Sequence, residues 1–229
     1  MKKLIPILTL IAAAINAAAS TLFIARLPDD NYPVHFDIAG QPDRYGSKWN
    51  YAFIGFIALL LAIVYIIYRI CTRDNENVQK NRRYEDVFIP CVIVLLGVLP
   101  WVFLRGITAE DPATAFTGRS GTAVLAIVII ALGVLMLFVS NIMAKLKPNR
   151  NFGLRVRATL KDETVWRRTH RLCGYTGCIA SLCLIICGIL ALCLPSLAVI
   201  FFAVGIGSII ILGVVVPTIY AEVLYKKLH

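Results

Sequence analysis

Six stretches of this sequence are each apolar over about the 20 residues that a helix needs to cross the hydrocarbon core of a bilayer. Hydrophobic residues make up 59% of the chain, whereas a typical soluble domain has about 45–50%. Because lipid offers no partners to backbone N–H and C=O groups, such stretches must be helical. We therefore predict an all-α integral membrane protein with six transmembrane helices, near 4–25, 50–70, 87–104, 121–144, 173–194 and 197–221.

The first stretch imitates a secretory signal peptide. Lys2 and Lys3 precede an apolar run, and the alanines at 17–19 resemble a cleavage site. The apolar run continues to Ala25, however, which is a spanning length and longer than the core of a signal peptide. We predict an uncleaved transmembrane helix.

The distribution of lysine and arginine predicts the orientation. In the six-helix arrangement, 18 of the 23 basic residues fall on one side and 5 on the other. Since cytoplasmic loops of membrane proteins are enriched in these residues, both termini are expected in the cytoplasm. The net charge of +10 then reflects this bias, and no direct contact with nucleic acid is expected. The protein would have an ordered outward loop at 26–49 and a basic inward loop at 145–172.

Three parts follow from this layout. Residues 1–70 form an N-terminal two-helix unit with the outward loop, and 71–120 comprise a linker loop and the third helix. Residues 121–229 form a three-helix unit with the inward loop. The segment 71–86 mixes charges of both signs and is predicted to be a solvated connector. Small residues four positions apart, at Ala13/Ala17 and Ala203/Gly207, favour close helix packing within the chain over dimerisation.

The outward loop has the pattern of an extended strand followed by turns. Residues 33–38 alternate between apolar and polar side chains, with Val34, Phe36 and Ile38 on one face and His35 and Asp37 on the other. Residues 40–46 supply the glycine and proline of turns. An ordered segment on the membrane surface is therefore expected.

The polar groups of this loop leave three readings open. His35, Asp37 and Asp43 are chemically suited to bind a metal ion, but they lack a short ligand spacing. A hydrogen-bonded histidine and a turn-capping Asp43 are the simpler interpretation. A docking surface for a partner outside the cell is the third. No metal and no cofactor is predicted.

The inward loop combines basic charge with residue types that anchoring to lipid does not require. Thr159 and Asp162 resemble a capping box for a helix that would begin near 160. In that helix the apolar and small side chains around Trp166 share one face, and the arginines point away. This pattern predicts an interfacial helix with Trp166 at the depth of the lipid headgroups. His170 lacks an accompanying nucleophile and is not predicted to be catalytic.

Taken together, the two loops resemble a known family. Asn149-x-x-x-Gly153-Leu154-Arg155, Thr159 and Val165-Trp166-x-x-Thr169-His170-Arg171 are similar to the signature of the SdpI family of bacterial multi-pass membrane proteins. Pro33-x-His35-Phe36 with Gly40-x-Pro42-Asp43 resembles the small N-terminal domain of unknown function that often precedes that signature. The pattern departs from the family at Lys161-Asp162 and at Tyr32.

The resemblance implies immunity against a secreted toxin of the sporulation-delaying protein type, together with signalling by capture of a cytoplasmic transcriptional repressor. On the outer face it implies a toxin-facing or structural role for Pro33, His35, Phe36, Asp37, Gly40, Pro42 and Asp43. On the inner face it implies a partner-docking or structural role for Asn149, Gly153, Arg155, Thr159, Trp166, His170 and Arg171.

Two other classes of function remain open from the residues alone. A lipid or peptide transporter, a flippase or a general role in envelope homeostasis is the main alternative, although no ionisable side chain lies near the centre of a predicted span. A membrane enzyme ranks third because neither loop contains a nucleophile and a base at a suitable spacing. We therefore predict a non-enzymatic protein of the bacterial cytoplasmic membrane.

Overall fold

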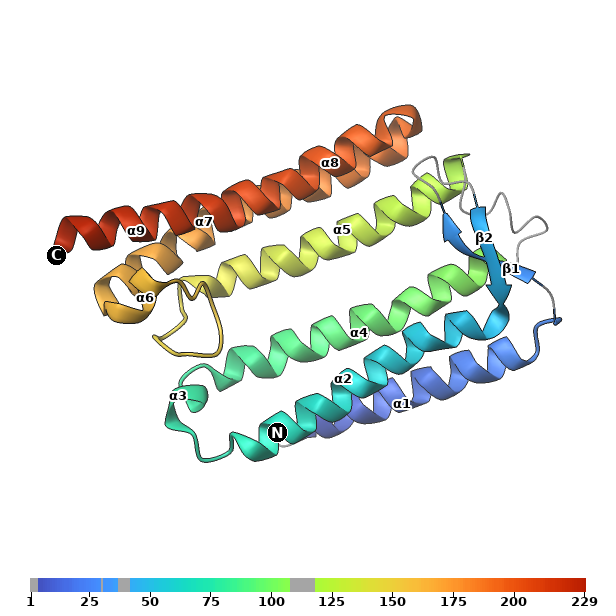
Figure 1. The fold of residues 1–229 in the computed structure, drawn as a ribbon, viewed down its shortest axis with the longest axis horizontal. Coiled ribbons are helices and arrows are strands. Elements are labelled where there is room, and N and C mark those ends of the chain that lie inside the picture. The colour runs from blue at the N-terminus through green and yellow to red at the C-terminus, as the bar shows by residue number, and fades with distance from the viewer. Residues whose placement is uncertain (1–3, 30, 37–41, 108–117) are drawn as a thin grey trace. The chain divides into compact units, whose positions relative to one another are not determined.

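The structure is a computed structural model that describes residues 4–29, 31–36, 42–107 and 118–229. Helices make up most of these residues (Figure 1). The longer helices are α1 (Leu4–Ala25), α2 (Ala52–Cys71), α4 (Arg82–Ile107), α5 (Gly118–Met143), α7 (Glu163–Cys193), α8 (Ala198–Ser208) and α9 (Val216–Leu228). The shorter ones are α3 (Glu76–Gln79), α6 (Arg157–Lys161), two 3-10 turns at Lys48–Tyr51 and Pro195–Leu197, and a π-helix at Ile209–Val215.

Five helical stretches of the described chain are long and apolar enough to cross a membrane. They are Leu4–Ala25, Lys48–Cys71, Gly121–Met143, Glu163–Cys193 and Pro195–Leu228. Five of the six predicted spans match these stretches. The remaining span, 87–104, lies within the helix α4. Its crossing of the membrane, and the placement of loops and termini on the two sides, stay predictions.

The prediction of an all-α protein is wrong in one respect, because the outward loop contains a β-hairpin. Strand β1 (Asn31–Phe36) pairs antiparallel with β2 (Pro42–Ser47). The register is irregular on both sides of His35, since Pro33 pairs with Tyr45 and His35 with Arg44. Val34 is therefore an extra residue, and the strict alternation expected for 33–38 is interrupted.

The chain forms two compact units. The first comprises residues 1–71 and 86–125, and the second comprises 72–85 and 126–229. The division into three parts at 70 and 120 concerns the organisation of the sequence, which these compact units do not test, so it stays a prediction.

Small residues hold the helices of the first unit together. Ala13 packs in one core cluster with Ala58, Ala62, Tyr65 and Ile93, which come from α1, α2 and α4. Ala17 is buried as well. The predicted packing of the first pair of small residues within the chain is thus confirmed. The second pair behaves differently, because Ala203 is exposed and no other atom lies within 4 Å of a Cβ built on Gly207.

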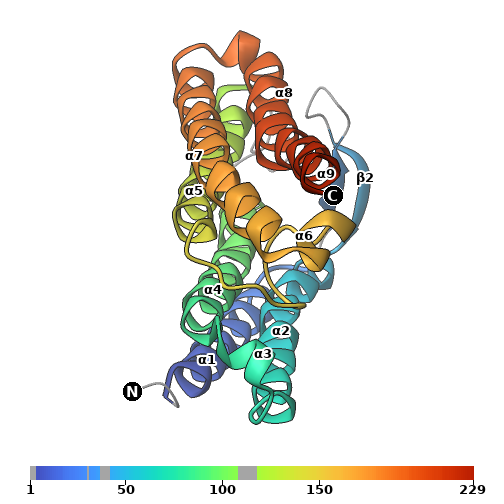
Figure 2. The same cartoon turned by 90° about the vertical axis from the view of Figure 1, so that its left-hand side faces the viewer.

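The second unit is built on α7. Its core contains Ala126 and Ile129 of α5, Leu184 and Ala191 of α7, and Phe202 of α8. At the other end of α7, α6 and α9 lie against the helix (Figure 2). The backbones of α5 and α7 approach closely, since a Cβ added at Gly177 would lie 2.5 Å from Ser140 Oγ.

The last predicted span is one continuous helical run with an irregular centre. The π-helix Ile209–Val215 joins α8 to α9, and Pro217 is the second residue of α9. Proline lacks the N–H that would continue the α-helical ladder. The wider π turn accommodates this position without ending the helix, as expected for a proline inside a membrane span.

Candidate functional site

Asn149 organises the backbone at the start of the inward loop. Its side-chain Oδ1 accepts hydrogen bonds from the backbone N–H groups of Asn151 (2.8 Å) and Phe152 (2.7 Å). Its Nδ2 donates to the carbonyls of Lys147 (2.9 Å) and Phe152 (3.0 Å). The amide is buried, and all four of these bonds hold the loop itself. Asn149 is therefore a structural residue of the loop.

Gly153 and His170 form the next contact. Gly153 has φ +112°, a conformation that L side chains rarely adopt, and a Cβ there would lie 2.5 Å from His170 Nε2. The N–H of Leu154 donates to the same Nε2 over 3.1 Å. Glycine is required because the loop backbone passes directly over the imidazole ring.

The second nitrogen of His170 is also engaged. Nδ1 lies 2.9 Å from the carbonyl of Trp166, which can only accept, so Nδ1 carries the proton. Nε2 accepts, so the geometry corresponds to a neutral ring. The ring is fully buried and stacks on Trp166 at a centroid distance of 3.9 Å. His170 therefore holds the loop to α7.

The indole of Trp166 is enclosed by the inward loop. Its side chain is 0% exposed, and its Nε1 donates to the carbonyl of Leu146 over 2.9 Å. The indole therefore packs inside the protein, where the loop supplies its polar partner, and its depth at the lipid headgroups stays a prediction. The predicted interfacial helix is instead the first part of the continuous helix α7. The predicted faces are confirmed, with Val165, Trp166 and Thr169 buried and the arginines exposed.

Thr159 and Asp162 cap two different helices. Thr159 Oγ1 accepts the N–H of Val156 (3.1 Å) and lies within bonding distance of the carbonyls of Leu154 (2.9 Å) and Val156 (3.0 Å). Thr159 therefore lies inside α6 and closes its first turn. Asp162 caps α7 by accepting the N–H of Val165 over 2.8 Å. The predicted box with Thr159 as the cap residue is wrong, because the chain breaks at Asp162 and begins a new helix there.

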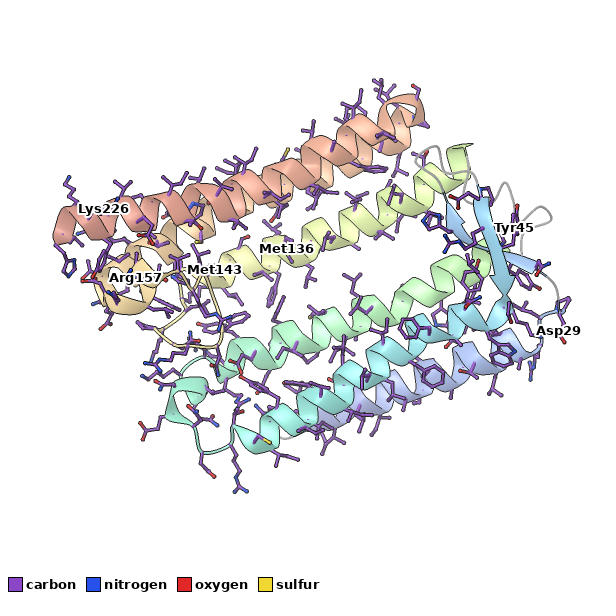
Figure 3. The ribbon with its side chains drawn as sticks, in the orientation of Figure 1. Asp29, Tyr45, Met136, Met143, Arg157 and Lys226 are labelled. Atoms are coloured by element: carbon purple, nitrogen blue, oxygen red, sulfur yellow. The ribbon has the colours of Figure 1, made fainter. Side chains whose placement is uncertain are left out.

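The predicted residues of the inward loop thus fall into two groups. Asn149, Thr159, Trp166 and His170 are buried and maintain the loop conformation. Arg155 and Arg171 are exposed, and Arg155 donates to the carbonyl of Arg150. Figure 3 shows the neighbouring Arg157 at the same end of the second unit as Lys226. Of the predicted set, only the two arginines offer free polar surface to a partner.

The segment 71–86 is only in part the solvated connector that was predicted, because most of 71–80 is exposed but the end of the segment is buried. Asn81 is 0% exposed, and its side chain exchanges two hydrogen bonds with the backbone of Lys147, at 2.8 Å and 2.9 Å. Arg82 is buried too and donates to the carbonyl and hydroxyl of Thr72. The segment forms part of the loop structure. The mixed charges of the segment gave no indication of this buried part. The residues that could have indicated it are Asn75 and Asn81, of which Asn75 caps α3.

The polar groups of the hairpin pair with each other. His35 Nδ1 lies 2.6 Å from Asp43 Oδ1, and both side chains are about half exposed. This is the predicted hydrogen-bonded histidine, with Asp43 as its partner. Pro42 begins β2 and pairs with the backbone of Phe36. Asp37 and Gly40 lie outside the described residues, so the roles expected for them stay predictions.

The anchoring of the hairpin was not predicted. Tyr32 and Pro33 are buried, and the Tyr51 hydroxyl donates to the carbonyl of Pro33. The nearly buried Lys48 donates to the carbonyl of Leu27 (2.5 Å) and lies 2.8 Å from Asp29. A cation at the carbonyl-rich end of a helix is favourable, so Lys48 ties the end of α1 to the start of the next span.

Among the described residues, no three histidine, cysteine, aspartate or glutamate side chains come together as a metal site would require. The described pair of His35 and Asp43 provides two possible ligands.

Comparison with known proteins connects both loops to one kind of protein. Residues 145–221 match the model of the SdpI/YfhL protein family, and residues 10–61 match that of the domain of unknown function DUF1648. The chain is 24% identical over 224 residues to the Immunity protein SdpI of Bacillus subtilis (strain 168), covering 97% of each chain. These matches confirm the resemblance inferred from the sequence. No solved structure matches the chain.

Proposed function

We propose, from the premise that this chain is a homologue of the SdpI/YfhL protein family, that it is a non-enzymatic immunity protein of the bacterial cytoplasmic membrane. It would give its host resistance to a secreted peptide or protein toxin. It would also signal by recruiting a transcriptional repressor from the cytoplasm.

The observation that carries the proposal is similarity over nearly the whole chain. The relative named an immunity protein aligns with 97% of the sequence, so the alignment includes both the hairpin region and the inward loop. The several apolar helices agree with a multi-pass membrane protein.

The hairpin is the proposed contact for the toxin. His35, Arg44, Tyr45 and Trp49 are all exposed, so aromatic and cationic groups are available at one site. Lys48 and Tyr51 hold this surface in place. A preorganised surface binds with a smaller loss of conformational entropy than a mobile loop does.

The inward loop is the proposed dock for the repressor. Arg155 and Arg171 are exposed on a backbone that is fixed by Asn149, Gly153 and His170. Exposed guanidinium groups on a rigid scaffold suit carboxylates on a partner protein.

A non-enzymatic role is supported by the bonding of His170. Both ring nitrogens of His170 are occupied by backbone partners, which leaves no nitrogen to act on a substrate. Catalysis by general base would require a histidine within reach of a proton to be removed.

The test is survival of a toxin-sensitive bacterium that expresses the protein and is exposed to a toxin of the sporulation-delaying type. Wild type is expected to protect. His35→Ala should reduce protection because it removes the partner of Asp43 on the hairpin. Arg73→Ala, which changes an exposed residue outside both sites, serves as the control and should protect fully.

A second measurement separates the two roles. Arg155→Ala should preserve survival while a fluorescent repressor no longer accumulates at the membrane. If wild type gives no survival advantage against any toxin of this class, the immunity proposal is rejected and the transporter or envelope-homeostasis alternative takes its place.

A further inference from the structure

One face of α7 carries a continuous row of exposed side chains that changes in character along the helix. The residues recur at intervals of three and four, so they lie on one side of the helix. Every member is exposed. The row consists of Thr164, Arg168, Arg171, Tyr175, Ile179, Leu182, Ile186 and Ile189.

The polar end of this row is concave and cationic. Thr164, Arg167, Arg168 and Arg171 line a hollow of about 230 Å³. Glu163 lies 3.6 Å from Arg167. Arg168 and Arg171 make no ion pair with any carboxylate of the described residues, so their guanidinium groups remain available for an anion. Arginine is well suited to phosphate because its planar donors match the phosphate oxygens.

The apolar end of the row has the properties of a lipid contact. Ile179, Leu182 and Ile186 are 60%, 49% and 54% exposed. Since α7 meets the length and hydropathy of a membrane span, we expect these exposed side chains to face hydrocarbon. The boundary between water and hydrocarbon therefore falls between Arg171 and Ile179. Tyr175 lies between them, where amphipathic aromatic rings are enriched.

We propose that this row on α7 is a binding site for one anionic phospholipid. The phosphate of the headgroup occupies the hollow between Arg168 and Arg171, and the hydroxyl of Thr164 is available as a further donor. An acyl chain lies along Ile179, Leu182 and Ile186. A zwitterionic lipid is disfavoured because its ammonium group brings a positive charge to the two unpaired arginines.

A free phosphate would share the chemistry of the polar end, but it would gain nothing from the apolar end. Binding of a whole lipid therefore has two independent requirements, the pair of arginines and the acyl chain. This site is separate from the hairpin but shares Arg171 with the proposed repressor dock, so a bound lipid and the repressor would compete for that side chain. The proposal does not depend on a role in immunity.

The test is native mass spectrometry of the full chain in a neutral detergent, titrated with phosphatidylglycerol or with phosphatidylcholine. The unaltered protein is expected to bind one phosphatidylglycerol more tightly than phosphatidylcholine. The double variant R168Q/R171Q should bind phosphatidylglycerol about 30-fold more weakly, because each arginine near an anionic lipid contributes about a fivefold factor. Both residues are exposed, so the helix tolerates the exchange.

The matched control is K226Q/K227Q, which removes the same charge from two exposed residues of α9. It should leave the affinity within about twofold, since separated surface charges are screened. If the control loses as much affinity for phosphatidylglycerol as R168Q/R171Q does, the proposal is overturned. Equal affinity of the unaltered protein for the two lipids overturns it as well, and this comparison needs no variant. Displacement of the lipid by an equal concentration of inorganic phosphate would identify a free-phosphate site instead and likewise overturn it.

Discussion

Individual side chains of the inward loop serve mainly to shape the backbone. Asn149 makes four hydrogen bonds within the loop, and both nitrogens of His170 bind backbone groups. A polar residue such as asparagine or histidine in a loop can therefore be needed for the loop conformation and need not be catalytic. The polar surface left for partners comes from arginines, whose long side chains extend away from the same backbone.

Gly153 gives the sharpest prediction at this scale. Gly153→Ala should lower the stability of the protein by about 1–3 kcal/mol, because the new Cβ meets His170 Nε2 and the positive φ is strained. The apparent midpoint of thermal unfolding in detergent should fall by about 2–4 °C for each kcal/mol. Gly207→Ala is the control, since a Cβ there meets nothing within 4 Å. Equal midpoints for the two variants would contradict the assigned role of Gly153.

Thr159 allows its hydroxyl to be tested separately from its volume. Thr159→Val keeps the shape of this buried side chain but leaves the N–H of Val156 without its partner, which should cost about 1–3 kcal/mol. Thr159→Ser retains the hydroxyl and should remain close to wild type. The measurement is again thermal unfolding in detergent. A Val variant as stable as the Ser variant would show that the hydroxyl contributes nothing.

At the scale of elements, the inward loop is joined to a segment more than 60 residues away in sequence. Asn81 follows α3 and pairs with both backbone groups of Lys147. This contact makes the segment 72–85 part of the same unit as the loop. A segment with charges of both signs can be a solvated linker or can pack against another part of the chain. Which of the two occurs depends on whether another segment offers hydrogen-bond partners to it.

Asn81→Ala should release this junction. The N–H of Lys147 donates to Asn81 Oδ1, so its hydrogen exchange should accelerate by about fivefold or more, corresponding to about 1 kcal/mol. Peptides that cover 145–150 report the effect by mass spectrometry. Asn77→Ala is the matched control because Asn77 is exposed and, among the described residues, its side chain bonds only to the side chain of Lys80. Unchanged exchange at Lys147 in the Asn81 variant would refute the junction.

At the scale of the whole molecule, charge distribution is the basis for the predicted topology. With 18 of 23 basic residues on one side, both termini and the loops at 71–86 and 145–172 are expected in the cytoplasm. Fusions of a reporter that is active only outside the cytoplasm should be active in the hairpin and in 105–120. Fusions at the C-terminus or in 145–172 should be inactive. An active fusion at the C-terminus would overturn the six-span arrangement.

The sequence by itself determined the properties that depend on composition and period. Apolar runs of spanning length must be helical because lipid cannot form hydrogen bonds with free backbone N–H and C=O groups. The helical period separated the buried face of α7, with Val165 and Thr169, from its arginines. The residues of both loops were sufficient to indicate a resemblance to the SdpI family, and the matches at 10–61 and 145–221 confirm that resemblance.

Only the tertiary structure decided what each of these residues contacts. Trp166 has the amphipathic side chain of an interfacial anchor, but the carbonyl of Leu146 satisfies its N–H, so it is buried. The same holds for Asn81 and Lys48, whose polar groups find backbone partners 66 and 21 residues away. Burial of a polar side chain depends on whether a partner is positioned to receive it, and that position is a property of the folded chain.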